Sequence, residues 1–389
     1  GLPVDPRREV HSLSVGERQR VEIIRCLLQH PALIILDEPT SVLTPQAVRQ
    51  LFKTLRMLAS QGVSILYISH KLHEIKELCD EATILRNGQV TGNVDPREKS
   101  TSDLARLMIG RDLPTYIRAE YQGIPETCFQ VENLGYKSDD PFGVSLQNIN
   151  LSVQAGEIVG IAGISGNGQA ELLSLLSGEA LTKTGRLYLE QQEITALTAG
   201  QRRNVGLGFV PEERLGRGAV PNMTLAQNVL LTAYRQKFTR WGLIKFSDIQ
   251  TFAEKIIKKF GVKASGANAE ARSLSGGNLQ KFIVGREILQ NPKFLIVAQP
   301  TWGVDVGASM FIRQTLIDLS RQGVGILVIS EELEELFEMS DRICVLANGE
   351  LSNPVPTQQT NAESIGLLMS GIQCHEATSN TAEEQHAHA

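Results

Sequence analysis

The sequence lacks several features that would place it in a familiar class. Its five cysteines are scattered over 389 residues and form no CxxC pair, so we predict neither a disulfide framework nor a zinc site, and a reducing cytosol fits best. No apolar run approaches the ~18 residues that a membrane-spanning helix needs, and no signal peptide opens the chain. If the protein works at a membrane, we expect another subunit to cross it.

A strong charge of one sign is also absent. The 38 basic and 43 acidic residues give a net charge of −5 and are mixed along the chain, so no nucleic-acid partner is predicted. The length is more typical of two domains than of one, at roughly 100–200 residues per domain. The chain begins with glycine, and its first twelve residues have the composition of a loop. We therefore expect a fragment or a processed form.

The sequence does contain an internal repeat, at a constant offset of 261 residues. The segment that begins at Ser12 is SLSVGERQRVEIIRCLLQHPALIILDEPT, and the one that begins at Ser273 is SLSGGNLQKFIVGREILQNPKFLIVAQPT. The match continues without gaps as far as Gly88 and Gly349. A register held over this length indicates that one module occurs twice and that the first copy lacks its front.

Both copies alternate between helical and strand patterns. In the first copy we predict helices at 15–29, 45–60 and 71–79, and short buried strands at 32–36, 63–68 and 82–85. In the second copy we predict an antiparallel edge at 129–132 and 146–153, a buried strand at 157–162, and helices at 169–176 and about 246–260. Alternating strands and helices predict an α/β fold whose parallel sheet is covered on both faces.

These patterns divide the chain into four segments. We expect residues 1–111 to be the C-terminal part of the first module, 112–127 a Pro/Gly-containing linker, and 128–372 the complete second module. Residues 373–389 are polar and predicted to be disordered. Within the second module, a region from about Val220 to Ala271 is predicted to be a helical insert.

Three polar residues follow two of the buried strands in the first copy. Asp37 suits a Mg²⁺ ligand, and Glu38 suits a general base that polarises an attacking water. His70, after the next strand, would as a neutral imidazole contact a γ-phosphate. Each has a plainer interpretation, a strand-end acid that caps a turn or a structural histidine. The three at this spacing are far more specific than any one alone.

A serine followed by small residues precedes a helix in both copies. The motifs are LSVGE at 13–17 and LSGGN at 274–278. Such a helix N-terminus presents free N–H groups and the positive end of the helix dipole to a phosphate. An ordinary serine-capped helix is the alternative for either motif alone. Because the motif occurs twice, each time some two dozen residues before a strand that leads into the DEP-type position, the phosphate interpretation is strong.

Together these motifs make the chain resemble the ATPase subunit of an ABC importer, of the fused two-domain kind that serves simple sugars and nucleosides. The resemblance extends from His11 to about Gly371 and implies an α/β fold of two tandem P-loop NTPase domains, the first incomplete. In that family, each ATP is sandwiched between the P-loop, magnesium Asp and catalytic Glu of one domain and the signature of the other. Features such as LTPQ after DEPT favour the nucleoside branch.

The second copy departs from the family pattern at its phosphate loop. No GxxxxGK[ST] occurs in the sequence, and 163–170 reads GISGNGQA in the expected strand–turn–helix context. Gln169 stands where the phosphate lysine belongs, and Ala170 where the magnesium hydroxyl belongs. The N–H groups of Gly166, Asn167 and Gly168 need no side chains and would still bind nucleotide weakly. The remaining members of this predicted loop site are Gly163 and Ser165.

The second copy has also lost the residues that correspond to the acidic pair and the histidine. Ala298 and Gln299 replace Asp37 and Glu38, and Glu331, which would repel a γ-phosphate, replaces His70. We therefore expect one hydrolytic and one degenerate composite site. The first would use the absent P-loop, Asp37, Glu38 and His70, closed by Ser275, Gly276 and Gly277. The second would use the 163–170 loop, closed by Ser14 and Gly16.

Three further residues are weaker candidates. Tyr136 would stack on adenine or be a buried aromatic of an edge strand. Asp305, in GVD, corresponds to the family's D-loop, where the first copy has Thr44, and Glu212 replaces the usual Q-loop glutamine.

The resemblance also implies cofactors, partners and location. It implies ATP and Mg²⁺, two membrane-spanning permease subunits, indirectly a substrate-binding protein, and a peripheral position at the cytoplasmic face of the plasma (inner) membrane. Two alternatives stay open, a non-hydrolytic regulatory pseudo-ATPase and a soluble tandem ABC ATPase that acts on ribosomes or DNA.

Overall fold

The computed structural model describes most of both copies. The described residues are 6–7, 9–10, 15–29, 31–40, 43, 45–86, 88–110, 126–138, 143–164, 166–233, 238–241 and 243–369. The predicted tail and almost all of the predicted linker lie outside them, and the end of the linker overlaps a strand that begins at Thr127. None of the described helices is long and apolar enough to cross a membrane.

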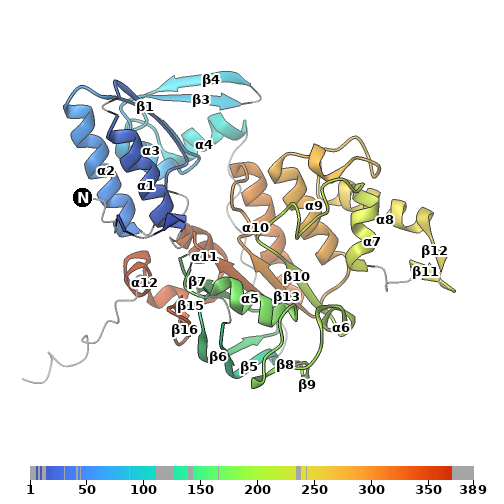
Figure 1. Ribbon diagram of the computed structural model, residues 1–389. Coiled ribbons are helices and arrows are strands. Elements are labelled where there is room, and N and C mark those ends of the chain that lie inside the picture. The colour runs from blue at the N-terminus through green and yellow to red at the C-terminus, as the bar shows by residue number, and fades with distance from the viewer. Residues whose placement is uncertain are drawn as a thin grey trace, which may run out of the picture.

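The first copy folds as a parallel pair of strands packed against helices around a small core, with a separate antiparallel hairpin (Figure 1). Its elements are α1 Val15–Leu27, β1 Leu33–Asp37, α2 Pro45–Ser60, β2 Ser64–Ile68, α3 Leu72–Leu78, β3 Ala82–Arg86, β4 Gln89–Val94 and α4 Thr101–Ile109. β1 and β2 are parallel and in register from Leu33 opposite Ser64 to Asp37 opposite Ile68. This register brings the carboxyl ends of the two strands together. Each helix and strand predicted for the first copy is confirmed to within three residues at its ends.

The second copy adds a seven-stranded sheet and a separate antiparallel sheet. Its elements before the signature helix are β5 Thr127–Tyr136, β6 Leu146–Gln154, β7 Ile158–Ala162, α5 Gln169–Ser177, β8 Thr184–Leu189, β9 Gln192–Glu193, α6 Ala199–Asn204, β10 Leu207–Val210, α7 Leu225–Ala233, β11 Thr239–Arg240, β12 Leu243–Ile244 and α8 Phe246–Lys259. Its later elements are α9 Gly276–Ile288, β13 Phe294–Ala298, α10 Val306–Arg321, β14 Gly325–Ser330, α11 Leu333–Met339, β15 Arg342–Ala347, β16 Glu350–Leu351, β17 Val355–Pro356 and α12 Ala362–Met369. The larger sheet has the order β10-β13-β14-β7-β15-β16, with β17 also on β15, and the antiparallel sheet has the order β6-β5-β8-β9.

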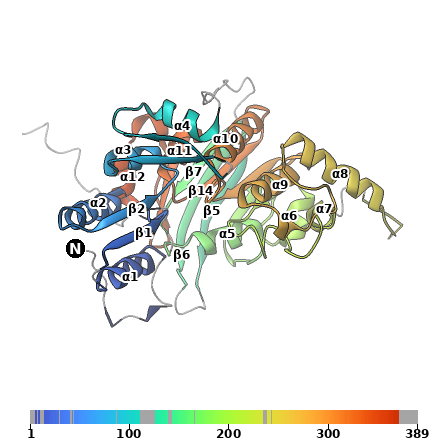
Figure 2. The ribbon, with the colours of Figure 1, turned by 90° about the horizontal axis from the view of Figure 1, so that it is seen from above.

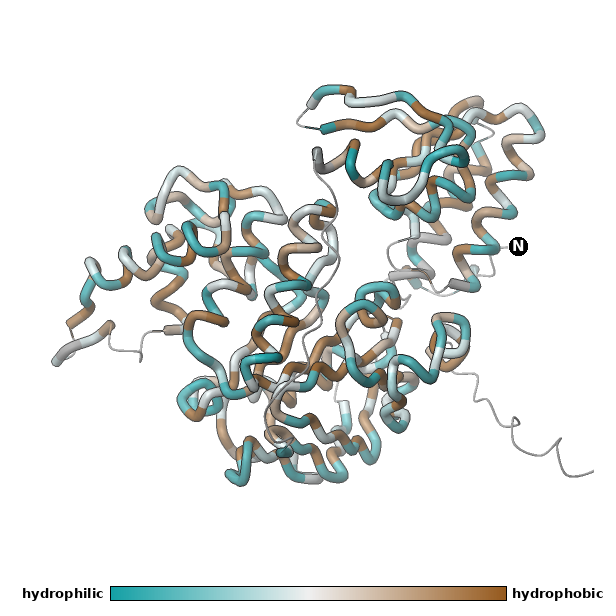
Figure 3. Tube along the Cα trace, turned by 180° about the vertical axis from the view of Figure 1, so that it is seen from behind, coloured by the Kyte–Doolittle hydropathy of each residue, from teal (hydrophilic) through white to brown (hydrophobic). Residues whose placement is uncertain are grey.

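The central sheet of the second copy is buried on both faces, as predicted. Successive residues of β13 enter opposite cores, with Leu295 and Val297 packed among α9, α10 and the insert, and Phe294 and Ile296 packed against β5, β6 and α5. Phe294 stacks on Phe129 with a centroid distance of 4.2 Å. Figure 3 shows the hydrophobic strands in the interior of this copy.

The corresponding sheet of the first copy is buried on one face only, which contradicts the prediction of cover on both. Ile34 is 2% exposed, whereas its neighbours Leu33 and Ile35 are 53% and 60% exposed. Leu66 in β2 is also 51% exposed. The second copy covers the equivalent face with the layer that includes β5, β6 and α5, and the first copy has no such layer among its described elements.

The contacts between the two copies have approximate twofold symmetry, and Figure 2 shows the two copies from above. An offset of 261 residues relates α2 to α10, α3 to α11 and α4 to α12. The contacts come in exchanged pairs, because α4 contacts α10 and α2 contacts α12. His73 and Glu334, which occupy equivalent positions, meet each other at 2.9 Å. A residue that contacts its own counterpart lies next to the twofold axis of an isologous interface.

Candidate functional site

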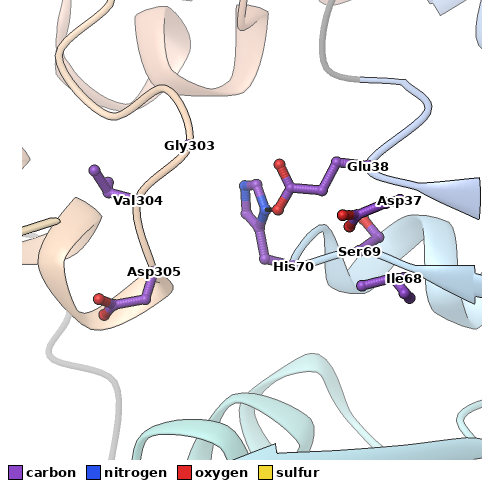
Figure 4. Close-up of a pocket in the computed structure, with 8 residues that line it drawn as sticks. All are labelled: Asp37, Glu38, Ile68, Ser69, His70, Gly303, Val304 and Asp305. Atoms are coloured by element: carbon purple, nitrogen blue, oxygen red, sulfur yellow. Dashed lines mark hydrogen bonds and ion pairs between the residues drawn. The ribbon is translucent and has the colours of Figure 1, made fainter. Parts of the chain in front are cut away.

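A cleft of about 660 Å³ lies between the two copies (Figure 4). The first copy lines it with Asp37, Glu38, Ile68, Ser69 and His70, and the second with Gly303, Val304 and Asp305. The structure therefore brings together the three polar residues that the sequence singled out. It also brings to them the turn that precedes α10, which the sequence identified only as a minor candidate.

Glu38 holds its place through an unusual backbone conformation. Its φ is 45°, in the left-handed region that non-glycine residues seldom adopt, and its N–H donates to the carbonyl of Ile68 at 2.8 Å. This bond ties the turn after β1 to the end of β2. It directs the carboxylate into the cleft beside His70.

The Glu38 and His70 side chains form an ion pair, with 2.7 Å between Oε1 and Nδ1. The hydrogen bond to His70 lowers the pKa of Glu38 although partial burial opposes the shift. The same bond raises the pKa of His70, again against the effect of burial, and the charges of Glu38 and Glu332 add to the rise. The pair therefore favours the imidazolium more than an isolated histidine would, and the neutral imidazole at a γ-phosphate stays a prediction.

Asp37 points its carboxylate toward the same cleft from the last position of β1 (Figure 4). Within the described residues, no group of three His, Cys, Asp or Glu side chains forms a ready-made metal cage. Mg²⁺ characteristically takes only one or two carboxylates together with substrate phosphates and water. A single carboxylate beside an open cleft fits that mode of binding.

On the opposite wall, the signature of the second copy packs against the Asp305 turn. Ser275 is the N-cap of α9, and its hydroxyl accepts a hydrogen bond from the Asn278 side chain at 2.8 Å. A Cβ on Gly277 would lie 3.2 Å from an Asp305 carboxylate oxygen, so this position favours glycine. Asp305 itself caps α10 by accepting a bond from the N–H of Ala308 at 2.9 Å.

The predicted signature residues are only partly visible in the site. Ser275, Gly276 and Gly277 stand behind the turn and are not among the residues that line the cleft. Their contact with a phosphate stays a prediction. In the first copy, Ser14 lies outside the described residues and Gly16 lies in the first turn of α1.

The phosphate-loop region of the second copy is closed by its own hydrogen bonds. The Gln169 amide donates to the carbonyl of Ile164 at 2.7 Å, and its oxygen accepts from the N–H of Asn167 at 3.2 Å. That N–H also donates to Ile164. The Asn167 side chain is buried and donates to the carbonyl of Met369, at the end of α12. One of the three N–H groups predicted to be free for phosphate is therefore engaged inside the loop.

The other loop positions complete this picture. Gly163 is crowded by Gln169, because a Cβ there would clash with the Gln169 amide. Gly166 and Gly168 have φ of 91° and 107°, which suits glycine, and Ala170 begins α5 together with Gln169. Ser165 lies outside the described residues.

The turn after β13 reproduces the backbone of the turn after β1. Gln299 has φ 47°, and its N–H donates to the carbonyl of Ile329 at 2.8 Å. Its side-chain oxygen accepts from the N–H of Glu331 at 3.3 Å. The two copies thus share one geometry, and an ion pair in the first is replaced in the second by a neutral amide, which cannot act as a base.

A buried carboxylate that was not predicted from the sequence lies behind each turn. Glu74 accepts hydrogen bonds from Thr40 at 2.6 Å and from Tyr67 at 2.5 Å. Its equivalent, Glu335, accepts from Thr301 at 2.6 Å and Ser330 at 2.7 Å. Burial raises the pKa of Glu335 to about 7, with Arg313 opposing the rise. Both glutamates hold the strand-end turn against the following helix.

The threonine and glutamate of this contact repeat at the offset of 261, and that repetition would have revealed them.

Tyr136 and Glu212 lie elsewhere in the second copy. Tyr136 ends β5 opposite Leu146 and is half-buried against the core, so both predicted interpretations remain open. Burial and the neighbouring Glu213 raise the pKa of Glu212, with Arg217 opposing.

The chain is similar to known proteins over most of its length. The ABC transporter family model matches residues 2–41 and 146–302. The chain is 38% identical to the nucleoside import ATP-binding protein NupA of Lactococcus lactis over 95% of its own length and 73% of that protein. It is 34% identical to the ribose import ATP-binding protein RbsA of Caldanaerobacter subterraneus, over 95% of its own length and 74% of that protein.

Solved structures show the same fold. A dimeric ATP-binding cassette in a post-hydrolysis state, bound to ADP and phosphate, is similar over 60% of this chain and all of its own, with a TM-score of 0.52 and 23% identity.

Proposed function

Because the chain belongs to the ABC transporter family, with the α/β P-loop NTPase fold of its ATP-binding proteins, we propose that it binds and hydrolyses ATP to energise an importer of nucleosides or simple sugars. The observation that carries the proposal is the cleft in which Asp37, Glu38 and His70 of one copy face Gly303–Asp305 of the other. The relatives named for nucleoside and ribose import support the class of cargo.

The proposed organisation is a pair of tandem nucleotide-binding modules, 1–111 and 128–372, of which the first is incomplete. The exposed apolar face of β1 and β2 supports this, because the second module covers the equivalent residues with a layer that carries its phosphate loop. Leaving Leu33, Ile35 and Leu66 in water is unfavourable at about 25 cal/mol per Å². A P-loop half at this face would bury them and supply the missing lysine.

The roles within the site follow from its chemistry. Asp37 would hold Mg²⁺, whose chemistry when bound is to neutralise charge on the phosphates. Glu38, ionised through its contact with His70, would accept a hydrogen bond from the attacking water and orient it. For the carboxylate to reach that water, the pair must loosen, and His70 would then be free to donate to a phosphate oxygen.

The second site would be a weak binding site without hydrolysis. The amide oxygen of Gln299 is too weakly basic to act as a general base. The Gln169 amide donates to the carbonyl of Ile164 and closes the loop, so it would not contact a phosphate. Ser14 and Gly16 would form the opposite wall of this site. If no P-loop half completes the first module, the replacements in the second site favour the alternative function, a regulatory pseudo-ATPase that does not hydrolyse ATP.

The proposed partners are two membrane-spanning permease subunits and, indirectly, a substrate-binding protein, at the cytoplasmic face of the membrane. Closure of the two modules on ATP and their release after hydrolysis would drive the permeases.

The test compares steady ATP turnover by the 389-residue chain with turnover by a longer chain that includes a complete first module. We expect negligible turnover by the first and magnesium-dependent turnover by the second. Sustained turnover by the 389-residue chain would contradict the proposed roles, because its loop at 163–170 would then have to support hydrolysis.

A further inference from the structure

Several apolar side chains at the end of the helical insert are exposed. They belong to the β11–β12 hairpin and the start of α8, which lie on the side of the second copy that faces away from the first copy (Figures 1 and 2). Among the described residues, four large hydrophobic side chains are at least 70% exposed, and three of them are Trp241, Leu243 and Phe246, at 90%, 75% and 70%. Ile244, between them, is 40% exposed. We call these four residues the apolar tip.

The apolar tip belongs to an ordered hairpin. β11 and β12 pair antiparallel, with Thr239 opposite Ile244, and the N–H of Lys245 donates to the carbonyl of Phe238 at 2.8 Å. Phe238 is buried and meets Phe252 of α8 edge to face, with centroids 5.4 Å apart. The hairpin is therefore anchored at its base while its end projects. Trp241 lies in the turn with φ 57°, a conformation that a bulky residue adopts only when its surroundings hold it there.

The sequence around the apolar tip is strongly basic. Residues 234–263 contain eight lysines and arginines and two acidic residues, although the whole chain has a net charge of −5. Three of these lysines, Lys255, Lys258 and Lys259, are exposed along α8. At the base of the apolar tip, Lys245 contacts Asp248 at 3.6 Å. A surface of this charge is complementary to an anionic one.

The combination favours a lipid surface over a protein partner. The apolar tip projects from the end of a helix, and none of its residues lines the cleft between the copies. A projecting Trp and Phe flanked by lysines is typical of segments that place aromatic rings at the headgroup level and keep their charges in water. Each basic residue near an anionic leaflet strengthens binding about fivefold.

We propose that the apolar tip, Trp241, Leu243, Ile244 and Phe246, enters the headgroup region of an anionic bilayer, with Lys255, Lys258 and Lys259 of α8 over the lipid phosphates. This contact goes beyond the proposed ATPase function and does not depend on it. It would hold this face of the subunit against the membrane in addition to its contact with the permeases.

Tryptophan fluorescence of the 389-residue chain tests the proposal without any other protein. The chain has two tryptophans, so Trp302→Phe leaves Trp241 as the only emitter. With vesicles of phosphatidylcholine and phosphatidylglycerol at low salt, we expect co-sedimentation and a blue shift of the Trp241 emission. Vesicles of phosphatidylcholine alone should bind at least about tenfold more weakly, since more than one basic residue contributes.

A matched pair of variants distinguishes binding through the apolar tip from nonspecific adsorption to vesicles. Leu243→Ser should weaken binding to the anionic vesicles by about tenfold or more, because a buried leucine side chain would be lost from the lipid. Leu181→Ser, at a leucine that is 49% exposed elsewhere, should bind as the parent does. Circular dichroism would check that both variants fold.

Two results would overturn the proposal. One is equal vesicle binding by Leu243→Ser and the parent. The other is binding only to vesicles that carry permease subunits, which would identify the apolar tip as a protein contact. Neither result would bear on ATP turnover, so the proposed function is tested separately.

Discussion

The turn after β1 and the turn after β13 have the same backbone but different side chains. Glu38 and Gln299 share a left-handed φ and donate to equivalent carbonyls at 2.8 Å. In the first copy the turn carries a carboxylate paired with His70, whereas in the second it carries an amide against Glu331. The fold therefore preserves the backbone of this turn whether the residue that follows the strand is a glutamate or a glutamine.

The two copies also differ in how far their sheets are buried. The second copy buries its sheet on both faces, yet it has Ala298 and Gln299 where the first copy has Asp37 and Glu38. The first copy has the carboxylate pair but leaves one face of its sheet exposed. The account therefore predicts that chemistry depends on the first copy and that stability depends on the second.

The largest expected effect is on turnover, in a longer chain with a complete first module. Glu38→Gln removes the base and should lower kcat by about 10²–10⁴-fold. Gln299→Ala at the equivalent position should change kcat far less. Steady-state phosphate release measures both, and comparable losses in the two variants would abolish the asymmetry between the copies.

The next effect concerns stability. In the 389-residue chain, Ile296→Ala should lower the unfolding free energy by about 2–5 kcal/mol, because it opens a cavity in a two-sided core. Ile35→Ala, at the equivalent and 60% exposed position, should change it by less than about 0.5 kcal/mol. Urea denaturation provides the values. Equal losses would show that the β1 face is already covered.

A third prediction uses Glu335, whose pKa burial raises to about 7. An acid whose pKa is higher in the folded than in the unfolded state destabilises the fold progressively as pH rises from about 4.5 to about 7. Relative to Glu335→Gln, the parent should therefore lose up to about 3 kcal/mol of unfolding free energy over this range. If the unfolding free energies of the two proteins changed in parallel with pH, the pKa of Glu335 would not be raised in the folded state.

The smallest effect is on the titration of His70. Its pKa is raised and that of Glu38 lowered, so their ion pair exists from below the ordinary glutamate range to above the ordinary histidine range. The stabilisation should fade as pH falls through the lowered Glu38 pKa or rises through the raised His70 pKa. Both groups are partly exposed, so we expect a weak pair.

Nuclear magnetic resonance of the imidazole measures this pairing directly. Glu38→Gln should return the His70 pKa toward its ordinary range, and Gln299→Ala should leave it in place. An unchanged pKa in Glu38→Gln would mean that the pair does not form in solution.

Much of this arrangement was predictable from sequence because the two copies of the repeat can be compared position by position. The repeat located β1, α2 and their counterparts, and the replacements at Ala298 and Gln299 predict which of the two sites is weaker. These predictions depend on local periodicity and on residue identity, which a sequence contains.

What the sequence did not predict depends on contacts between distant segments. The β11–β12 hairpin is too short to have a clear strand pattern, and the approach of Asp305 to Glu38 requires the two copies to be placed in space. The one-sided burial of β1 is likewise invisible, since LIIL has the same composition whether or not a second layer covers it.

The most direct test of the division between the copies counts nucleotide trapped with magnesium and vanadate in the longer chain with a complete first module. The account predicts one tightly held nucleotide per chain, lost in Asp37→Ala and retained in Gln299→Ala. Two trapped nucleotides per chain, or a single one that survives Asp37→Ala and disappears in Gln299→Ala, would contradict it.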